Sequence, residues 1–339
     1  MDRGAIHDDD RLPILENGCR ITAAAHGRGC KTVRTPRNRR RSIDFDSPNR
    51  QSDWCPVSSE KTLAIVLRVV DFSETSVVLS LFTDTYGKIN ALAKGARRPK
   101  SSFYGAVDTL SLSQVIFLPR RSGTLDLLTE AKLVRRYRPC QWSLARLYAG
   151  YYLAELLTDL TEPHQAMPEL FRLAVDTLSD LQTPETAFAF QPVSAIVLRF
   201  EMRALSLLGH GLGLTHCAGC DKPLVGAPLA PTDNIEHLSN RRNGQLFFSL
   251  NDTSLVCRDC CQERGRLIGF SERAAQVLRI FQDENDEAWR QLSSWGVHPV
   301  FRQMMDYQWQ AILNRPLHLT SAIRQLTKKE RQAGSSRIG

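Results

Sequence analysis

The sequence has no apolar run long enough to cross a membrane. A membrane-spanning helix needs about 18 consecutive, largely uncharged residues, and the stretch from Leu144 to Leu157 is interrupted by Arg146 and Glu155. A secretory signal is also missing, because no apolar segment of about 7 to 15 residues precedes the first basic cluster. These absences predict a protein of the cytoplasm.

The motifs of several common enzyme classes are missing as well. The chain has neither a phosphate-binding P-loop, nor the Gly-x-Ser-x-Gly turn of the α/β-hydrolases, nor the His-Glu-x-x-His motif of zinc proteases. The run from Gly209 to Gly213 lacks the preceding strand and following helix that a dinucleotide-binding loop requires. His210 and His216 have no acidic partner nearby in the sequence, so we predict no catalytic residue and a protein that is not an enzyme.

Methionine is missing between Met1 and Met167. Residues 1–57 show neither the helical nor the strand period and are rich in Arg, Ser, Pro and Asp, which is typical of disorder. Because a valine codon can start translation in bacteria, Val57 is an alternative start. We therefore interpret residues 1–57 as a disordered basic extension or as the product of a wrongly assigned start, and residues 327–339 as a disordered tail.

The charge of the chain is unbalanced. It contains 44 Lys and Arg residues against 36 Asp and Glu residues, a formal net charge of +8. Two segments, Arg28 to Arg41 and Lys88 to Lys100, contain several basic residues and no acidic residue. This excess favours a polyanionic partner such as a nucleic acid.

Five short segments between residues 58 and 139 alternate with the period of a β-strand. They are Thr62 to Val70, Val77 to Leu81, Ile89 to Ala93, Leu110 to Leu118 and Leu125 to Leu133. Five short strands within about 75 residues fit the OB-fold, a small barrel. We expect residues 58–139 to form an OB-fold domain.

After Pro139 the apolar residues recur with the helical period of 3.6. Such stripes begin at Leu144, Leu170 and Val193, and further helices are expected around Ala274 and Phe301. The predicted fold class is therefore α+β. The OB-fold barrel is followed by a helical domain of residues 140–215 and 264–326, into which a zinc module of residues 216–263 is inserted.

Two matched cysteine pairs carry the strongest local signal. Cys217 and Cys220 form one Cys-x-x-Cys pair, and Cys257 and Cys260 form the second. Two such pairs can complete a tetrahedral thiolate site, which predicts one structural zinc ion per chain. Redox dithiols are the alternative, and Cys261 is a possible substitute for Cys260.

A basic connection between the third and fourth expected strands carries the second signal. It can follow phosphates, while aromatic side chains beside it stack on unpaired bases, although a basic run is often only a solvated surface. On an OB-fold barrel we favour DNA binding. The candidate DNA-binding residues are Lys88, Lys94, Arg97, Arg98, Lys100, Phe103, Tyr104, Arg120 and Arg121.

From Thr62 to Leu326 the chain resembles the RecO family of bacterial DNA-repair proteins. The residues that carry the resemblance are Ser73-Glu-Thr-Ser76, Tyr86-Gly-Lys88, Lys94-Gly-Ala-Arg97, Tyr151-Tyr-Leu-Ala-Glu155 and Arg199-Phe-Glu201. Two departures stand near the cysteines, where Gly211-Leu-Gly213 replaces a usual proline and Thr253-Ser254 replaces usual glycines.

The resemblance implies a role in recombinational repair. A RecO-like protein binds single- and double-stranded DNA, anneals complementary strands and works with RecR and the single-strand-binding protein SSB to load RecA at gaps and double-strand breaks. It also implies association with the nucleoid.

Two other functions remain open from the residues alone. One is a zinc-ribbon protein that binds nucleic acid in transcription or on ribosomal RNA through its metal module. The segment between Cys217 and Cys261 argues against it, because its basic residues are only Lys222, Arg241, Arg242 and Arg258. The other is a thiol oxidoreductase, which would need an exposed cysteine of low pKa.

Overall fold

The computed structural model describes residues 58–120, 125–138, 143–183, 192–226, 246–262, 264–284, 288–290 and 299–325. Residues 55–339 form one compact unit. The two segments expected to be disordered, residues 1–57 and 327–339, lie outside the described residues. No helix within the described residues is long and apolar enough to span a membrane.

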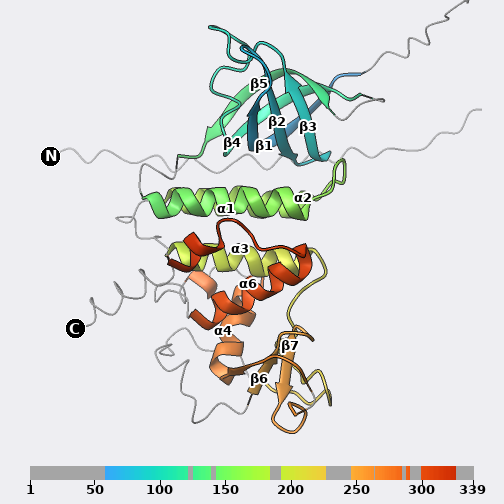
Figure 1. The fold of residues 1–339 in the computed structure, drawn as a ribbon, viewed down its shortest axis with the longest axis vertical. Helices are drawn as coiled ribbons and strands as arrows, with labels where there is room; N and C mark the ends of the chain where they lie inside the picture. Colours follow the sequence, from blue (N-terminus) through green and yellow to red (C-terminus); the bar gives the residue numbers. More distant parts are fainter. Residues whose placement is uncertain are drawn as a thin grey trace, which may run out of the picture. The chain divides into compact units, whose positions relative to one another are not determined.

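A closed five-stranded barrel forms the N-terminal part of this unit (Figure 1). Its strands follow the order β1-β2-β3-β5-β4, with β3 and β5 parallel and the other neighbours antiparallel. The strands are β1 (Glu60–Asp71), β2 (Val77–Thr83), β3 (Gly87–Ala93), β4 (Ser111–Leu118) and β5 (Asp126–Arg136). This small five-stranded barrel confirms the predicted OB-fold.

Alternating side chains fill the barrel. Along β2 and β3 the buried residues, among them Leu79, Leu81 and Ile89, alternate with residues that face outward. Phe103, from the β3–β4 connection, is 4% exposed and packs among them. The barrel core is thus closed by a residue of the basic connection itself.

Helices follow the barrel, as the change of period predicts (Figure 1). They are α1 (Leu144–Leu160), α2 (Pro168–Gln182), α3 (Val193–Leu207), α4 (Glu272–Gln282) and α6 (Pro299–Leu313). Ser271 caps α4, since its hydroxyl accepts a hydrogen bond from the backbone N–H of Ala274 at 3.1 Å. Beyond α3, Gly209 adopts φ +79° and the N–H of His210 reaches the carbonyl of Leu205 at 2.8 Å, a Schellman motif that ends the helix.

A three-stranded antiparallel sheet lies between α3 and α4 in the sequence. It consists of β6 (Leu246–Ser249), β7 (Ser254–Cys257) and β8 (Leu267–Phe270), in the order β7-β6-β8. Strand β7 ends in the first cysteine of the second pair. The small sheet therefore delivers Cys257 to the expected metal site.

A buried ionic network joins three helices. Arg302 of α6 forms two hydrogen bonds of 2.7 Å with the carboxylate of Glu201 on α3. Tyr152 of α1 and Trp309 of α6 donate to the same carboxylate at 2.5 and 2.8 Å. Because each partner satisfies the others, this charge pair can lie within the apolar core of the helical domain.

Candidate nucleic-acid interface and metal centre

The outward face of β2 and β3 carries uncharged side chains near the basic connection, while Phe82 and Lys88 at its other end pack against the helical domain. Val78 lies beside Leu92, and Ser80 lies beside Asn90 in the register of the two strands. The hydroxyl of Ser80 donates to the Asn90 side-chain oxygen at 2.8 Å. The equivalent face of an OB-fold, with its β1–β2 and β4–β5 loops, is where such barrels bind oligonucleotides.

The basic connection is fastened to the β1–β2 loop at one end of this face. The backbone N–H of Arg97 donates to the carbonyl of Thr75 at 3.0 Å, and that of Gly95 donates to the Ser76 hydroxyl at 3.3 Å. Gly95 adopts φ +72°, a conformation that glycine takes without strain. The two loops therefore form one surface.

Four cations of the connection reach solvent. The exposed residues are Lys94, Arg97, Arg98 and Lys100. Arg97 is already paired with the carboxylate of Asp71 at the end of β1. Lys94, Arg98 and Lys100 are thus the members of the predicted group best placed to meet an external anion.

The exposed aromatic residues beside these cations differ in part from those expected. Tyr104 is 87% exposed, in agreement with a contact surface, whereas its neighbour Phe103 is in the barrel core and cannot stack on a base. Phe72 in the β1–β2 loop is 62% exposed, and no sequence pattern singled it out as a contact residue. Assigning a stacking role to Phe103 was therefore wrong.

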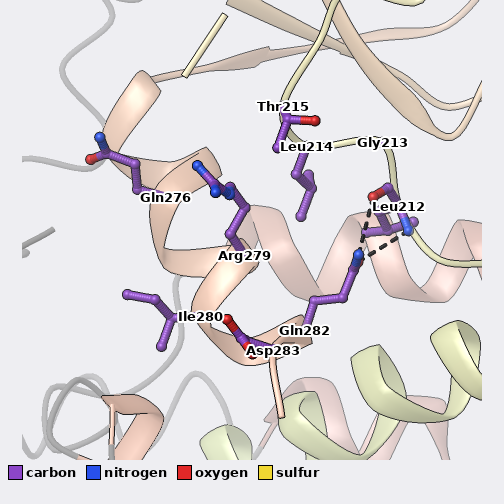
Figure 2. Close-up of a pocket in the computed structure, with 9 residues that line it drawn as sticks. All are labelled: Leu212, Gly213, Leu214, Thr215, Gln276, Arg279, Ile280, Gln282 and Asp283. Carbon is purple, nitrogen blue, oxygen red and sulfur yellow. Dashed lines mark hydrogen bonds between the residues drawn. The ribbon is translucent and has the colours of Figure 1, made fainter. Parts of the chain in front are cut away.

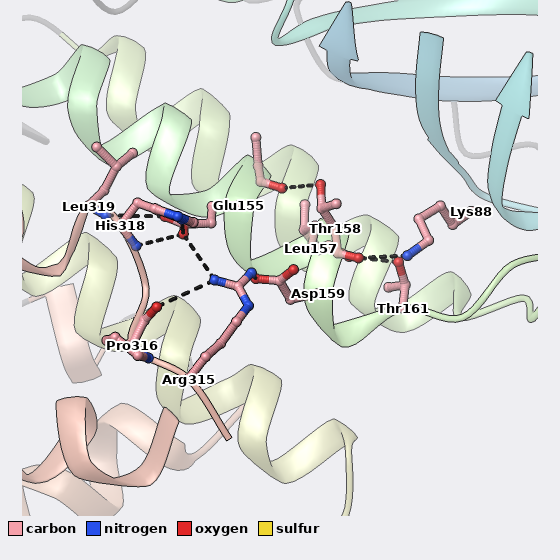
Figure 3. A network of polar contacts seen from close by, with 11 residues as sticks. Lys88, Glu155, Leu157, Thr158, Asp159, Thr161, Arg315, Pro316, His318 and Leu319 are labelled. Atoms are coloured by element: carbon pink, nitrogen blue, oxygen red, sulfur yellow. Dashed lines mark hydrogen bonds and ion pairs between the residues drawn. The ribbon is translucent and has the colours of Figure 1, made fainter. Parts of the chain in front are cut away.

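Lys88 is also placed differently from expectation (Figure 3). Its ammonium donates to the carbonyl of Thr158 in the last turn of α1 at 2.6 Å, and burial lowers its pKa. Its backbone carbonyl accepts from the N–H of His164 at 3.0 Å. Lys88 joins β3 to the end of α1, where a cation offsets the helix dipole, so it does not belong to the basic surface.

The β4–β5 connection approaches the same strand from the side. Asp126, the first residue of β5, lies beside Ala91 of β3, and its carboxylate accepts from the backbone N–H of Arg120 at 3.0 Å. The Arg120 side chain is exposed. Arg121 lies outside the described residues, and both arginines stay predictions.

The four predicted cysteines converge on one point. The sulfur atoms of Cys217, Cys220, Cys257 and Cys260 all lie within 4.8 Å of one another, and those of Cys220 and Cys257 are 3.8 Å apart. In a tetrahedral thiolate site with bonds of about 2.3 Å, neighbouring sulfurs are about 3.8 Å apart. The cluster therefore has the dimensions of a four-sulfur metal site.

Backbone groups organise these sulfurs. Cys217 Sγ accepts hydrogen bonds from the N–H groups of Gly219 and Cys257, both at 3.3 Å. Although burial raises the pKa of the Cys217 thiol, the surrounding hydrogen bonds outweigh burial and lower it from 9.0 to about 6. A Cβ on Gly219 would come within 2.8 Å of the Cys260 Cβ, so only glycine allows the two turns to approach this closely.

Cys261 does not join the cluster. Its thiol donates to the carbonyl of Arg258 at 3.0 Å, whereas the sulfur of Cys260 lies with the other three. Cys260 is thus the fourth residue of the cluster. An arrangement of four sulfurs also leaves no position for a substrate on a tetrahedral metal ion, which favours a structural role.

The segment that leads to Cys217 is attached to α4 beside a pocket of 320 Å³ (Figure 2). The side-chain amide of Gln282 donates to the carbonyl of Leu212 at 3.2 Å and accepts from its N–H at 3.1 Å. It pairs with the backbone as a neighbouring strand would. Gln282 therefore ties the segment that leads to Cys217 to helix α4.

Two family models match the chain. The model described as recombination protein O N terminal matches residues 57–137, and the model described as recombination protein O C terminal matches residues 142–297. Together they cover more than half of the sequence. The chain belongs to the RecO family.

Individual RecO proteins are similar over most of their length. The DNA repair protein RecO of Rhodopirellula baltica is 36% identical over 222 residues, which cover 66% of this chain and 74% of that protein. The RecO of Moorella thermoacetica is 28% identical over 239 residues, 70% of this chain and 78% of that protein. The RecO of an Anaeromyxobacter strain is 33% identical over 223 residues, 66% of this chain and 79% of that protein.

The two departures from the usual RecO residues meet in space. Gly213 and Ser254 form a β-bridge, and a Cβ on Gly213 would come within 2.1 Å of the Ser254 hydroxyl oxygen. The absence of a side chain at Gly213 therefore accommodates the serine. Thr253 adopts φ +53°, a conformation that favours glycine, the residue expected at this position from the RecO resemblance.

Proposed function

We propose that this RecO-family chain is a DNA-repair protein that binds single- and double-stranded DNA through its OB-fold barrel. It anneals complementary DNA strands and, together with RecR and SSB, assists the loading of RecA at gaps and double-strand breaks. It acts without catalysis, in the cytoplasm at the nucleoid. The observation that carries the proposal is the group of exposed cations at the end of β3, beside Val78, Ser80, Asn90 and Leu92 on the outward face of β2 and β3.

Phosphate contacts explain how one surface serves both forms of DNA. The side chains of Lys94, Arg98 and Lys100 project from a connection that hydrogen bonds hold against the β1–β2 loop. Cations at fixed positions neutralise phosphates and release counterions from either a single DNA strand or a duplex. Because such contacts carry no base information, binding is independent of sequence.

In this proposal each part of the chain has its own role. Residues 58–139 bind DNA, residues 140–215 and 264–326 form a helical scaffold, and residues 216–263 form a module held by one zinc ion. The ion is bound by the thiolates of Cys217, Cys220, Cys257 and Cys260 and supplies the cross-link that so small a sheet lacks.

Salt dependence tests the DNA surface. In the triple variant Lys94→Ala, Arg98→Ala, Lys100→Ala, about three phosphate contacts are lost. For single strands each contributes roughly 0.7 to the slope of log affinity against log salt, so the slope becomes shallower by about 2 units. Fluorescence anisotropy with a labelled oligonucleotide at several salt concentrations measures it.

Lys88→Ala is the matched control, because it removes a cation that faces α1 instead of solvent. Its slope should equal that of the wild type. If the triple variant binds DNA like the wild type while Arg241→Ala and Arg242→Ala abolish binding, the zinc module is the DNA-contacting part and the proposal fails.

A further inference from the structure

The β1–β2 loop and the end of β3 line an open surface pocket. Its lining includes aromatic, apolar and hydroxyl side chains as well as basic ones. It has a volume of 390 Å³, within the range of about 300–1,000 Å³ that is typical of small-ligand sites. Its walls are formed by Phe72, Thr75, Ser76, Leu92, Lys94 and Arg98, together with the backbone of Gly95. The pocket thus combines an aromatic ring, the apolar side chain of Leu92, two hydroxyls and two cations.

The aromatic side of the pocket is held in place by the loop. The backbone N–H groups of Phe72 and Ser73 both donate to the carbonyl of Ser76 at 3.1 Å, and the N–H of Ser76 returns a bond to the Ser73 hydroxyl at 3.2 Å. This tight turn presents the Phe72 ring to solvent, where it contributes nothing to the barrel core. An exposed ring on a rigid loop is prepared for a contact at little entropic cost.

The cationic side is fixed relative to that ring. Arg97 and Gly95 hydrogen-bond to Thr75 and Ser76 through their backbone N–H groups, so the connection that bears Lys94 and Arg98 cannot move independently of the β1–β2 loop. The backbone that carries the two cations is therefore held close to the backbone of the loop that carries the ring.

We propose that this pocket holds one unpaired base of a single DNA strand, stacked on Phe72, with the adjoining phosphates at Lys94 and Arg98. Base stacking on an aromatic ring is tolerant of sequence, because every base has a flat face. In a duplex both faces of a base are covered by its neighbours, so the pocket contributes only to single-strand binding. The inference rests on the proposed DNA surface and adds how that surface distinguishes unpaired from paired DNA.

Phe72→Ala tests the pocket by comparing three ligands of equal length: a single strand, a duplex, and a strand of abasic nucleotides. Loss of one stacked base weakens single-strand binding by about 5- to 150-fold. The salt slope stays unchanged, since no phosphate contact is lost. Affinity for the duplex and for the abasic strand stays at the wild-type value.

Two further variants complete the test. Phe72→Trp, which keeps a stacking surface, retains wild-type binding, and Val70→Ala, which removes a nearby exposed apolar side chain that does not line the pocket, has no effect. The inference is overturned if Phe72→Ala leaves single-strand affinity intact, or weakens binding to the duplex or the abasic strand equally. In either case a wild-type slope in the Lys94, Arg98, Lys100 variant would separately refute the proposed surface.

Discussion

At the scale of single residues, close neighbours in the sequence lie in different surroundings. Lys88 and Lys94 belong to the same acid-free segment, yet Lys88 binds the end of α1 and Lys94 reaches solvent. Phe103 and Tyr104 are adjacent, but Phe103 is buried and Tyr104 is exposed. Composition gives the sign of a charge or the apolar nature of a ring. The surroundings of Lys88 depend on a helix 70 residues away that covers this part of β3, and those of Phe103 depend on the path of an irregular loop, and neither is visible in a local pattern.

Buried Glu201 makes the stability of the fold depend on its ion pair. Its carboxylate has no exposure to solvent, and Arg302, whose side chain is 6% exposed, is its ionic partner. Removing one member of a buried pair leaves the other charged and without a partner in a medium of low dielectric constant. Arg302→Ala should therefore lower the free energy of unfolding by about 3–5 kcal/mol, measured by urea denaturation.

Arg324→Ala provides the comparison. Arg324 pairs with Asp306, as Arg302 also does, but 61% of its side chain is exposed. Because Asp306 keeps Arg302 as a partner and the Arg324 side chain is open to solvent, Arg324→Ala should cost about 0–1 kcal/mol, as for an exposed ion pair. Equal losses in the two variants would show that the buried network does not carry the stability assigned to it.

At the scale of elements, periodicity predicted the barrel strands and most helices because elements such as β2, β3, α2 and α4 bury one face. It misjudged the face of α1. The stripe that begins at Leu144 includes Tyr148 and Tyr151, all of which are exposed, while Arg146 is buried and donates to the carbonyls of Asp180 and Leu181. Helix α1 contacts β1, β2, α2 and α3, so most of its circumference is covered and no single stripe marks its interior.

The cysteine turns were predictable for a different reason, since a metal site fixes residue type and spacing together. Phe248 and Leu255 of the small sheet pack into the core of the helical domain, whereas beside the cysteines Val256 is the apolar residue buried with Cys217 and Cys257. Because this cluster is so small, we expect the metal to hold the cysteine turns. Purified protein should contain about one zinc ion per chain, and Cys217→Ser should release it and lower the thermal midpoint. Metal analysis and thermal unfolding measure the two effects.

Cys261→Ser is the control within the same turn. Because the Cys261 thiol points to the carbonyl of Arg258 and not into the cluster, this variant should keep its zinc and its stability. Zinc loss from Cys261→Ser, or a metal-free protein that unfolds at the same temperature as the loaded one, would contradict the assignment.

At the scale of the whole molecule, the four-cysteine cluster and the small sheet lie between α3 and α4 in the sequence instead of following the last helix. The chain leaves α3 at Gly209 and returns at Ser271, and the Gln282 amide joins the departing segment to α4. Sequence patterns indicated the insertion, because helical periodicity stops before the first cysteine pair and resumes after the second. They gave no sign of Gln282, which acts through a contact between residues 70 positions apart.

The basic N-terminal segment gives the last prediction. Residues 55–339 form one compact unit, and the match to the RecO N-terminal model begins at residue 57. A chain that starts at Val57 should therefore unfold at the same temperature and with the same cooperativity as the full chain, because a segment of this composition buries little apolar surface. Differential scanning calorimetry of the two purified chains makes the comparison. The shortened chain should also keep the response to Lys94→Ala, Arg98→Ala, Lys100→Ala, since those cations lie on the barrel. A lower midpoint or a broader transition after truncation would mean that the first 56 residues are part of the fold.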